Sequence, residues 1–231
     1  MKIKIFSHMV DLPGGSQITE EQTNLMINCG LIDNAEIYLC VNYDMNNYER
    51  LIKYFENVNN VHIINNNALP HEFECPTLKI LKDTCDDTEE TFAALYIHHK
   101  GVRHLNNPAV LDWRKYMEYF NIEQWRICVN RLENGWDTVG VDWKQNPVPH
   151  YSGNFWWARS DYIKKLPAWV RPIDNGFQKQ FPQLDASYAD YRMECEFWLG
   201  LENPKAFEIY TTPYRNPYVE GFEPHYYKIN A

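Results

Sequence analysis

Strand-like and helix-like segments alternate from residue 2 to residue 142, and this alternation is the feature that most constrains the fold. Predicted strands cover residues 2–9, 36–42, 61–64, 94–99 and 137–142, and predicted helices cover residues 20–32, 48–56, 76–83 and 113–133. Thr19 is the expected cap of the first helix, and residues 85–87 are expected to interrupt the third. The βαβαβαβαβ order predicts an α/β fold with a mostly parallel central sheet flanked by helices, of the Rossmann-like class.

The domain organisation is predicted from the length of the chain and from the point at which the regular alternation of strands and helices ends. A chain of 231 residues suits one domain of this class. From about Asn146 onward, prolines and aromatic residues replace the regular alternation. We therefore predict a single domain over residues 1–231, with residues 1–145 and 146–231 as its two halves.

Polar residues follow every predicted strand. Because the carboxyl ends of parallel strands meet at one edge of a sheet, where open α/β folds bind ligands, these ends predict a functional site. Surface loops are polar in most proteins, so the pattern also fits ordinary loops. The strand ends are Ser7-His8, Asn42-Tyr43-Asp44, Asn65-Asn66-Asn67, His98-His99-Lys100-Gly101 and Asp142-Trp143.

Charge and motif content exclude several classes of function. The net charge of −9, from 22 basic and 31 acidic residues, argues against nucleic-acid binding. The sequence has no GxGxxG, no GxxxxGK(S/T), no GxSxG and no HExxH. It therefore lacks the motifs that usually indicate a dinucleotide oxidoreductase, a P-loop enzyme, a serine hydrolase or a zincin. Six cysteines without a CxxC spacing, no secretory signal pattern and no apolar run of roughly 18 residues predict a soluble cytoplasmic protein with reduced thiols.

The segment His98-His99-Lys100-Gly101, at the end of the fourth predicted strand, is the first candidate for ligand chemistry. Lys100 offers a point charge to a diphosphate, the two imidazoles offer hydrogen-bond donors, and Gly101 lets a ligand approach the backbone. A metal site is an alternative, but adjacent residues of a strand face opposite ways and do not readily share one ion. Structural roles in a loop are the third alternative.

The segment from Pro149 to Arg159 (PHYSGNFWWAR) combines a turn, hydrogen-bonding side chains and two adjacent tryptophans. Ser152 and Asn154 suit sugar hydroxyl groups, and an indole ring suits the apolar face of a sugar. In a strand, Trp156 and Trp157 point to opposite faces, so one is expected in the core and the other at a cleft. A strand buried in the core is the alternative interpretation.

Three carboxylates are candidates for a general base. Glu194 and Glu196 lie two apart in a predicted helix, where they diverge by about 200°, so only one of them faces a cleft. Glu196, beside Phe197 and Trp198, is the preferred candidate, and Asp142 at the end of the fifth strand is another. Asp86 and Asp87 are interpreted as a solvated acidic run.

Taken together, several segments resemble a group of small glycosyltransferases found in bacterial polysaccharide loci and in large DNA viruses of algae. The resemblance spans roughly residues 94–200. It rests on residues 96–102 (YIHHKGV), 112–120 (DWRKYMEYF), Trp125, residues 137–141 (DTVGV) and residues 150–158 (HYSGNFWWA). It implies a GT-A-like fold and transfer of a hexosyl or deoxyhexosyl group from a nucleotide-diphosphate sugar to a glycan or glycoprotein acceptor, in polysaccharide or glycoprotein biosynthesis.

The resemblance also implies roles for the candidate residues. Residues 1–145 become the nucleotide-sugar-binding half and residues 146–231 the acceptor-side half. The expected donor-binding residues are Ser7, Asn42, His98, His99, Lys100 and Gly101, and the expected acceptor or sugar contacts are Ser152, Asn154, Trp156 and Trp157. Glu196, Asp142 or Glu194 would take the proton of the acceptor hydroxyl group. His225 is a weaker candidate near the diphosphate.

The chain departs from the pattern of many GT-A enzymes, which carry an Asp-x-Asp metal motif after the fourth strand. This sequence has His98-His99-Lys100 there, so dependence on Mn or Mg stays open. A carbohydrate-binding domain that kept the fold without activity is the main alternative, and a nucleotide-sugar hydrolase is a third. The sequence leaves open the donor sugar, the nucleotide base, the acceptor and the choice between retention and inversion.

Overall fold

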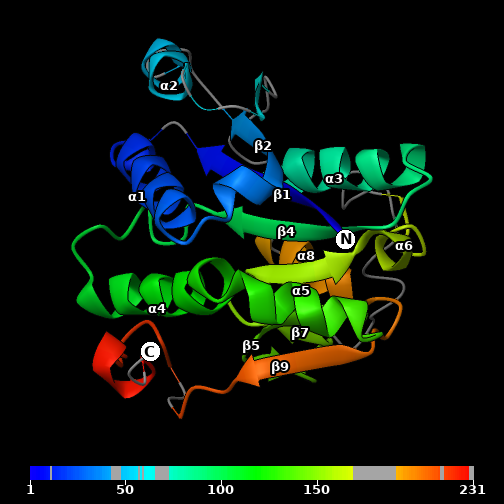
Figure 1. Ribbon diagram of the computed structural model, residues 1–231. Coiled ribbons are helices and arrows are strands. Elements are labelled where there is room, and N and C mark those ends of the chain that lie inside the picture. The colour runs from blue at the N-terminus through cyan, green and yellow to red at the C-terminus, as the bar shows by residue number, and fades with distance from the viewer. Residues whose placement is uncertain are drawn as a thin grey trace.

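A computed structural model gives the fold (Figure 1). It describes residues 1–10, 12–42, 48–56, 58, 60–65, 73–168, 191–213 and 216–228. The strands are β1 (Lys2–Val10), β2 (Ala35–Asn42), β3 (Val61–Asn65), β4 (Phe92–His98), β5 (Thr138–Val141), β6 (Trp143–Lys144), β7 (His150–Tyr151), β8 (Trp156–Arg159) and β9 (Ala206–Tyr210). The α-helices are α1 (Gly15–Asn28), α2 (Tyr48–Phe55), α3 (Cys75–Asp87), α4 (Pro108–Glu118), α5 (Trp125–Glu133), α6 (Ser160–Ile163) and α8 (Tyr191–Phe197).

The predicted α/β fold with a mostly parallel sheet flanked by helices is confirmed. Seven strands form the central sheet in the order β3-β2-β1-β4-β8-β5-β9, and β6 pairs with β7 in a separate small sheet. β8 is antiparallel to β4 and β5, whereas the other paired strands of the large sheet are parallel. Strand order reverses at β1, which has β2 on one side and β4 on the other. In open α/β sheets such a reversal opens a crevice at the carboxyl ends of the two strands.

Two helical layers cover the sheet (Figure 1), and successive side chains of β4 face one layer and then the other. Leu95 and Ile97 belong to the core under α1, α4 and α5, whereas Ala94 and Tyr96 belong to the core under α3, α6 and α8. This is the period of two that a strand imposes on its side chains. Because both faces are covered, every residue of β4 is buried, and the end of this strand is held rigidly.

The helix boundaries differ from the sequence predictions for local reasons. α1 begins at Gly15, so Thr19 is not its cap and instead donates a hydrogen bond within the helix to the Gly15 carbonyl. α3 continues through residues 85–87, where an ion pair between Lys82 and Asp86 joins successive turns. Asp86 is thus a partly solvated helix residue, in line with its interpretation as part of an acidic run.

The predicted helix over residues 113–133 is two α-helices joined by a π-helical turn, Tyr119–Glu123. The first helix begins earlier than predicted because Asn107 caps it, accepting a hydrogen bond from the Ala109 N–H at 3.0 Å. The wider turn presents its carbonyl groups to buried side chains. Trp157 Nε1 donates to the Asn121 carbonyl at 2.9 Å, and the Cys128 thiol donates to the Phe120 carbonyl at 3.3 Å.

Both tryptophans of β8 are core residues. They point to opposite faces of the sheet as predicted, Trp156 against Tyr96 and Trp157 beneath α5, and their exposed fractions are 1% and 0%. The expectation that one of them faces a cleft is therefore wrong. The reason is that β8 inserts between β4 and β5 in the middle of the sheet, where helices cover both faces.

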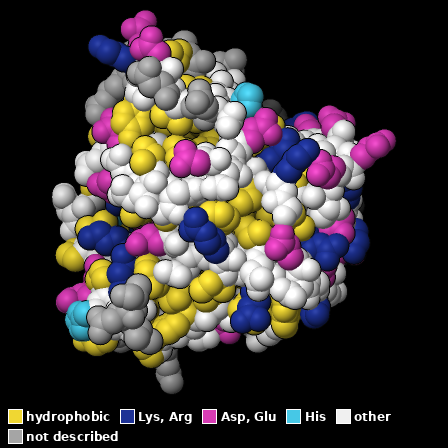
Figure 2. Space-filling view, in the orientation of Figure 1, with side chains coloured by type: hydrophobic (Ala, Val, Ile, Leu, Met, Phe, Trp, Pro, Cys, Tyr) yellow, Lys and Arg dark blue, Asp and Glu magenta, His cyan; other side chains and the backbone are white. Residues whose placement is uncertain are grey.

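On the face of the molecule drawn in Figure 2, basic and acidic side chains are interspersed. The sheet and helices beneath carry ion pairs between neighbouring elements, such as Lys4 of β1 with Glu36 of β2 at 3.0 Å. The described side chains of this face therefore form no large patch of a single sign of charge. In particular they form no broad basic patch, in keeping with the net charge of −9.

Candidate functional site

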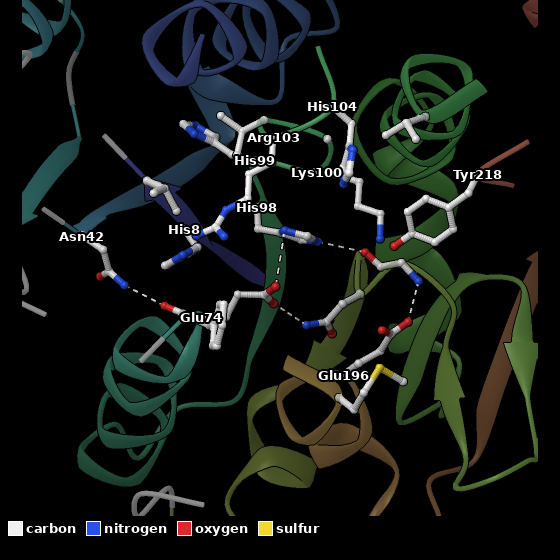
Figure 3. Close-up of a pocket in the computed structure, with 18 residues that line it drawn as sticks. His8, Asn42, Glu74, His98, His99, Lys100, Arg103, His104, Glu196 and Tyr218 are labelled. Carbon is white, nitrogen blue, oxygen red and sulfur yellow. Dashed lines mark hydrogen bonds and ion pairs between the residues drawn. The ribbon is translucent and has the colours of Figure 1, made fainter. Parts of the chain in front are cut away.

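A cavity of about 220 Å³ lies at the carboxyl ends of β1, β2 and β4, where the strand order reverses (Figure 3). The loop after β4, the turn before β8 and the ends of α3 and α8 complete its wall. The lining side chains that matter for the chemistry are His8, Asn42, Glu74, His98, His99, Lys100, Arg103, His104, Asn154, Glu196 and Tyr218. The predicted position of the site at the carboxyl edge of the sheet thus coincides with a cavity.

His98, the last residue of β4, is oriented by two neighbours. Its Nε2 lies 2.9 Å from the Gly153 carbonyl oxygen and must donate to it, because a carbonyl oxygen only accepts. Its Nδ1 faces Glu74 Oε1 at 3.5 Å. Burial, with a smaller effect of the nearby Lys100 charge, lowers the pKa of His98 to about 4. At neutral pH the ring is therefore uncharged, so its contact with Glu74 is not an ion pair and the hydrogen bond to Gly153 is what orients it.

The two other buried histidines of the cavity are also held by protein partners. His8 Nδ1 lies 2.9 Å from the Thr77 hydroxyl group, and burial lowers the pKa of His8 to about 4. His99 Nε2 lies 2.7 Å from the Thr19 hydroxyl group, and burial lowers its pKa well below the usual value. His98 and His99 point to different sides of the sheet, as adjacent strand residues do. Neither imidazole contributes positive charge at neutral pH.

Positive charge in the cavity comes from the loop after β4. Lys100 Nζ lies 3.8 Å from the centre of the Trp113 ring and 5.5 Å from that of Tyr218, so two aromatic faces hold the ammonium group. No carboxylate among the described residues forms an ion pair with Lys100. Arg103 lines the same wall. These two side chains are available to an anionic ligand.

Glu74 is a site residue that the sequence predictions missed. Its Oε2 accepts a hydrogen bond from Asn154 Nδ2 at 2.6 Å (Figure 3). The same oxygen accepts a second hydrogen bond from the Tyr96 hydroxyl group at 2.8 Å. It immediately precedes α3, whose second residue is Pro76. A proline at the start of a helix that follows a parallel strand marks the carboxyl edge of the sheet, and this signal could have found Glu74.

Glu196 lines the cavity from α8, and its Oε1 accepts a hydrogen bond of 2.7 Å from the Gly153 N–H. Glu194 lies outside the cavity lining and is 5% exposed. Its Oε2 has no hydrogen-bond partner among the described residues, and burial raises the pKa of Glu194 to about 7. The divergence of the two glutamates and the placement of Glu196 at a cavity agree with the predicted helix phase.

The turn Gly153-Asn154 connects the two carboxylates of the cavity. Both residues have positive φ, 89° and 59°. Asn154 donates to Glu74 and accepts a hydrogen bond of 2.7 Å from Trp156 Nε1. Trp156 thus orients Asn154 from the core and does not itself reach the cavity.

The remaining predicted site residues lie in different places. Asn42 lines the cavity and donates to the Phe73 carbonyl at 2.6 Å, and Gly101 lines it as well. Ser7 is buried in β1, and Ser152 contributes a backbone hydrogen bond to the Asp142 carbonyl; neither lines the cavity. The predicted strand-end residues Tyr43, Asp44, Asn66 and Asn67 lie outside the described residues.

Asp142 and His225 also lie away from the cavity lining. Asp142 accepts a hydrogen bond of 2.7 Å from the Thr212 N–H, and burial raises the pKa of Asp142 to about 6. It connects the end of β5 to the segment after β9. His225 is exposed, and its Nδ1 lies 3.3 Å from the Glu223 carboxylate.

Within the part of the chain that the structure describes, no three His, Cys, Asp or Glu side chains are grouped as metal ligands. Glu74 and His98 are two such side chains that lie together in the cavity, 3.5 Å apart. Both already have protein partners, Glu74 the Tyr96 hydroxyl group and His98 the Gly153 carbonyl.

The fold and the cavity define an α/β protein with a cavity at the topological switch point of its sheet. Residues 14–200 match the sequence model of a family described as "Domain of unknown function (DUF8361)", and the chain belongs to this family. No curated protein sequence matches it. None of the described helices is long and apolar enough to cross a membrane.

Proposed function

We propose that this protein is a glycosyltransferase that transfers a sugar from a nucleotide-diphosphate donor to a glycan or glycoprotein acceptor. The observation that carries the proposal is the composition of the switch-point cavity. One part of its wall, the loop after β4, carries Lys100 and Arg103, and the rest carries Glu74, Asn154 and Glu196. The sheet order is compatible with the GT-A-like fold that the sequence resemblance implies.

In this proposal the cationic wall binds the diphosphate. The main electrostatic task in such a transfer is to stabilise the departing nucleoside diphosphate. Lys100 is suited to it because Trp113 and Tyr218 hold its ammonium group without neutralising it. His98 is uncharged and its Nε2 is committed to Gly153, so its proposed role is to orient the turn and not to attract phosphate.

The other wall binds sugar hydroxyl groups and the acceptor. Glu196 is the proposed general base, since it lines the cavity and one of its oxygens is fixed by the Gly153 N–H. Tyr218 lines the cavity beside Lys100 with 47% of its surface exposed, and the part of its ring that Lys100 does not cover is proposed to meet the apolar face of a sugar. This replaces the stacking role expected of Trp156 or Trp157, which the core covers.

The experiment that tests the proposal is a calorimetric and thermal-shift screen of nucleoside diphosphates and their sugars, with and without Mn. A glycosyltransferase is expected to bind at least one diphosphate and to release it from the matching nucleotide sugar when an acceptor is present. A carbohydrate-binding domain would bind glycans and none of the nucleotides. A hydrolase would release free sugar without an acceptor.

Replacement of Lys100 by alanine is expected to weaken nucleotide-diphosphate binding roughly 10- to 100-fold, since a charge-assisted contact contributes about 1.5–3 kcal/mol. Titration calorimetry with the nucleotide found in the screen measures the change. Lys79→Ala is the matched control, because Lys79 pairs with Asp83 on the surface of α3. Equal affinity in wild type and Lys100→Ala would remove Lys100 from the donor site.

Chelation with EDTA is expected to leave most of the activity intact, because the proposed phosphate contacts of Lys100 and Arg103 do not depend on an ion. Initial rates before and after EDTA treatment, and after adding back Mn or Mg, measure this. Complete loss restored by Mn would mean that carboxylates of the site, Glu74 first among them, bind a metal with the donor phosphates.

A further inference from the structure

Two cysteines that are 120 residues apart in the sequence meet beside the cavity. Cys75 Sγ and Cys195 Sγ lie 3.3 Å apart, Cys75 as the first residue of α3 and Cys195 within α8. Their exposed fractions are 7% and 1%. The thiols of Cys29 and Cys128, in contrast, donate to backbone carbonyl groups.

We propose that Cys75 and Cys195 form a redox-active thiol pair that small oxidants such as hydrogen peroxide convert to a disulfide. The sulfur atoms are already in contact, and bond formation brings them from 3.3 Å to about 2.05 Å. Cytoplasmic disulfides, where they form, are commonly reversible and redox-sensing. The inference is independent of the proposed sugar transfer.

The chemistry balances with one peroxide. The Cys75 thiol, the more exposed of the two, attacks a peroxide oxygen, and Cys75 becomes a sulfenic acid with release of one water. The Cys195 sulfur then attacks the sulfenic sulfur, the S–O bond breaks, and the departing hydroxide takes the thiol proton to leave as a second water. Two thiols are oxidised by two electrons in total, and hydrogen peroxide is reduced to two waters.

The bond would join the two segments that hold the cavity turn. Glu74, which precedes Cys75, accepts a hydrogen bond from Asn154, and Glu196, which follows Cys195, accepts one from the Gly153 N–H. A disulfide between α3 and α8 therefore fixes both carboxylates relative to each other. Ligand affinity of the cavity is expected to differ between the reduced and the oxidised protein.

The test uses the full chain, reduced and then freed of reductant, and treated with a few equivalents of hydrogen peroxide. Alkylation under denaturing conditions and mass spectrometry are expected to show the loss of two of the six free thiols and a linked peptide pair containing Cys75 and Cys195, reversed by dithiothreitol. Overoxidation of either cysteine to a sulfinic acid without linkage would overturn the proposal. Linkage to other cysteines in comparable yield would overturn it as well.

A thermal measurement supports the assignment. The long loop between the two cysteines predicts that oxidation raises the melting temperature, by roughly 5–10 °C. Cys75→Ser is expected to abolish both the linked peptide and the rise, whereas Cys85→Ser, in the same helix and fully buried, is expected to retain both. A fall in melting temperature on oxidation would mean that the bond forms only by displacing α3 or α8. That result would contradict the proposal that the two thiols are already placed to form a disulfide. If Cys75→Ser does not fold, the wild-type peptide map decides the question alone.

Discussion

Replacement of Glu196 by glutamine is expected to lower turnover by about 10²- to 10⁴-fold while nucleotide-sugar binding stays nearly unchanged. Glutamine preserves the shape of the side chain, and its carbonyl oxygen can still accept the 2.7 Å hydrogen bond from the Gly153 N–H. It cannot take a proton from the acceptor hydroxyl group. The effect should therefore appear in kcat and not in donor affinity, measured with the donor identified by the nucleotide screen.

Glu194→Gln is the matched control on the same helix. Glu194 is 5% exposed and lies outside the cavity lining, so its replacement is expected to change turnover by no more than a few fold. If the two variants exchange effects, Glu194 is the base. If neither variant loses more than a few fold, the base is another carboxylate, with Glu74 the next in the cavity and Asp142 after it, or the protein binds sugars without transferring them.

Replacement of Gly153 by alanine is expected to lower the free energy of unfolding by about 2–5 kcal/mol and to abolish ligand binding in the cavity. Two costs combine. Residue 153 has φ of 89°, which costs an L-amino acid about 1–2 kcal/mol. A Cβ there would also lie 2.4 Å from Met117 Sδ and 3.0 Å from Trp113 Cζ2, and overpacking of this kind costs about 1–3 kcal/mol. Denaturant unfolding followed by fluorescence measures the loss.

Gly135→Ala separates the two costs. Gly135 has φ of 86°, but a Cβ there would meet no atom within 4 Å. Its replacement is expected to cost only the backbone term, about 1–2 kcal/mol. Equal losses of unfolding free energy in the two variants would show that Met117 and Trp113 move aside for the added Cβ without a cost in stability. Unchanged ligand binding in Gly153→Ala would show that the turn does not position Glu74 and Glu196.

The parts of the site that local sequence predicted are those that strand ends and helix phase determine. His98 to Gly101 follow a strand that is apolar along its length, so their position at the carboxyl edge was readable. The divergence of Glu194 and Glu196 follows from the angular spacing of a helix. Neither inference needs to know which elements are neighbours.

The positions of Glu74 and the two tryptophans depend on contacts between distant elements, which strand ends and helix phase do not predict. Glu74 reaches the cavity because α3 starts beside β4 and the turn before β8, which brings it to Tyr96 and Asn154. The alternation in β8 places Trp156 and Trp157 on opposite faces, but whether a face is open depends on the elements that cover it. Only the insertion of β8 between β4 and β5 buries both.

The sequence by itself determined the α/β class, the mostly parallel sheet and the edge of the sheet at which the cavity lies, because apolar periodicity and strand-end polarity are local properties of the chain. The tertiary structure alone decided which side chains meet there. It made His98 and His99 neutral by burying them, left Lys100 as an available cation over Trp113, and brought Cys75 to Cys195. Burial and long-range contact depend on how distant segments pack, and no local pattern encodes that packing.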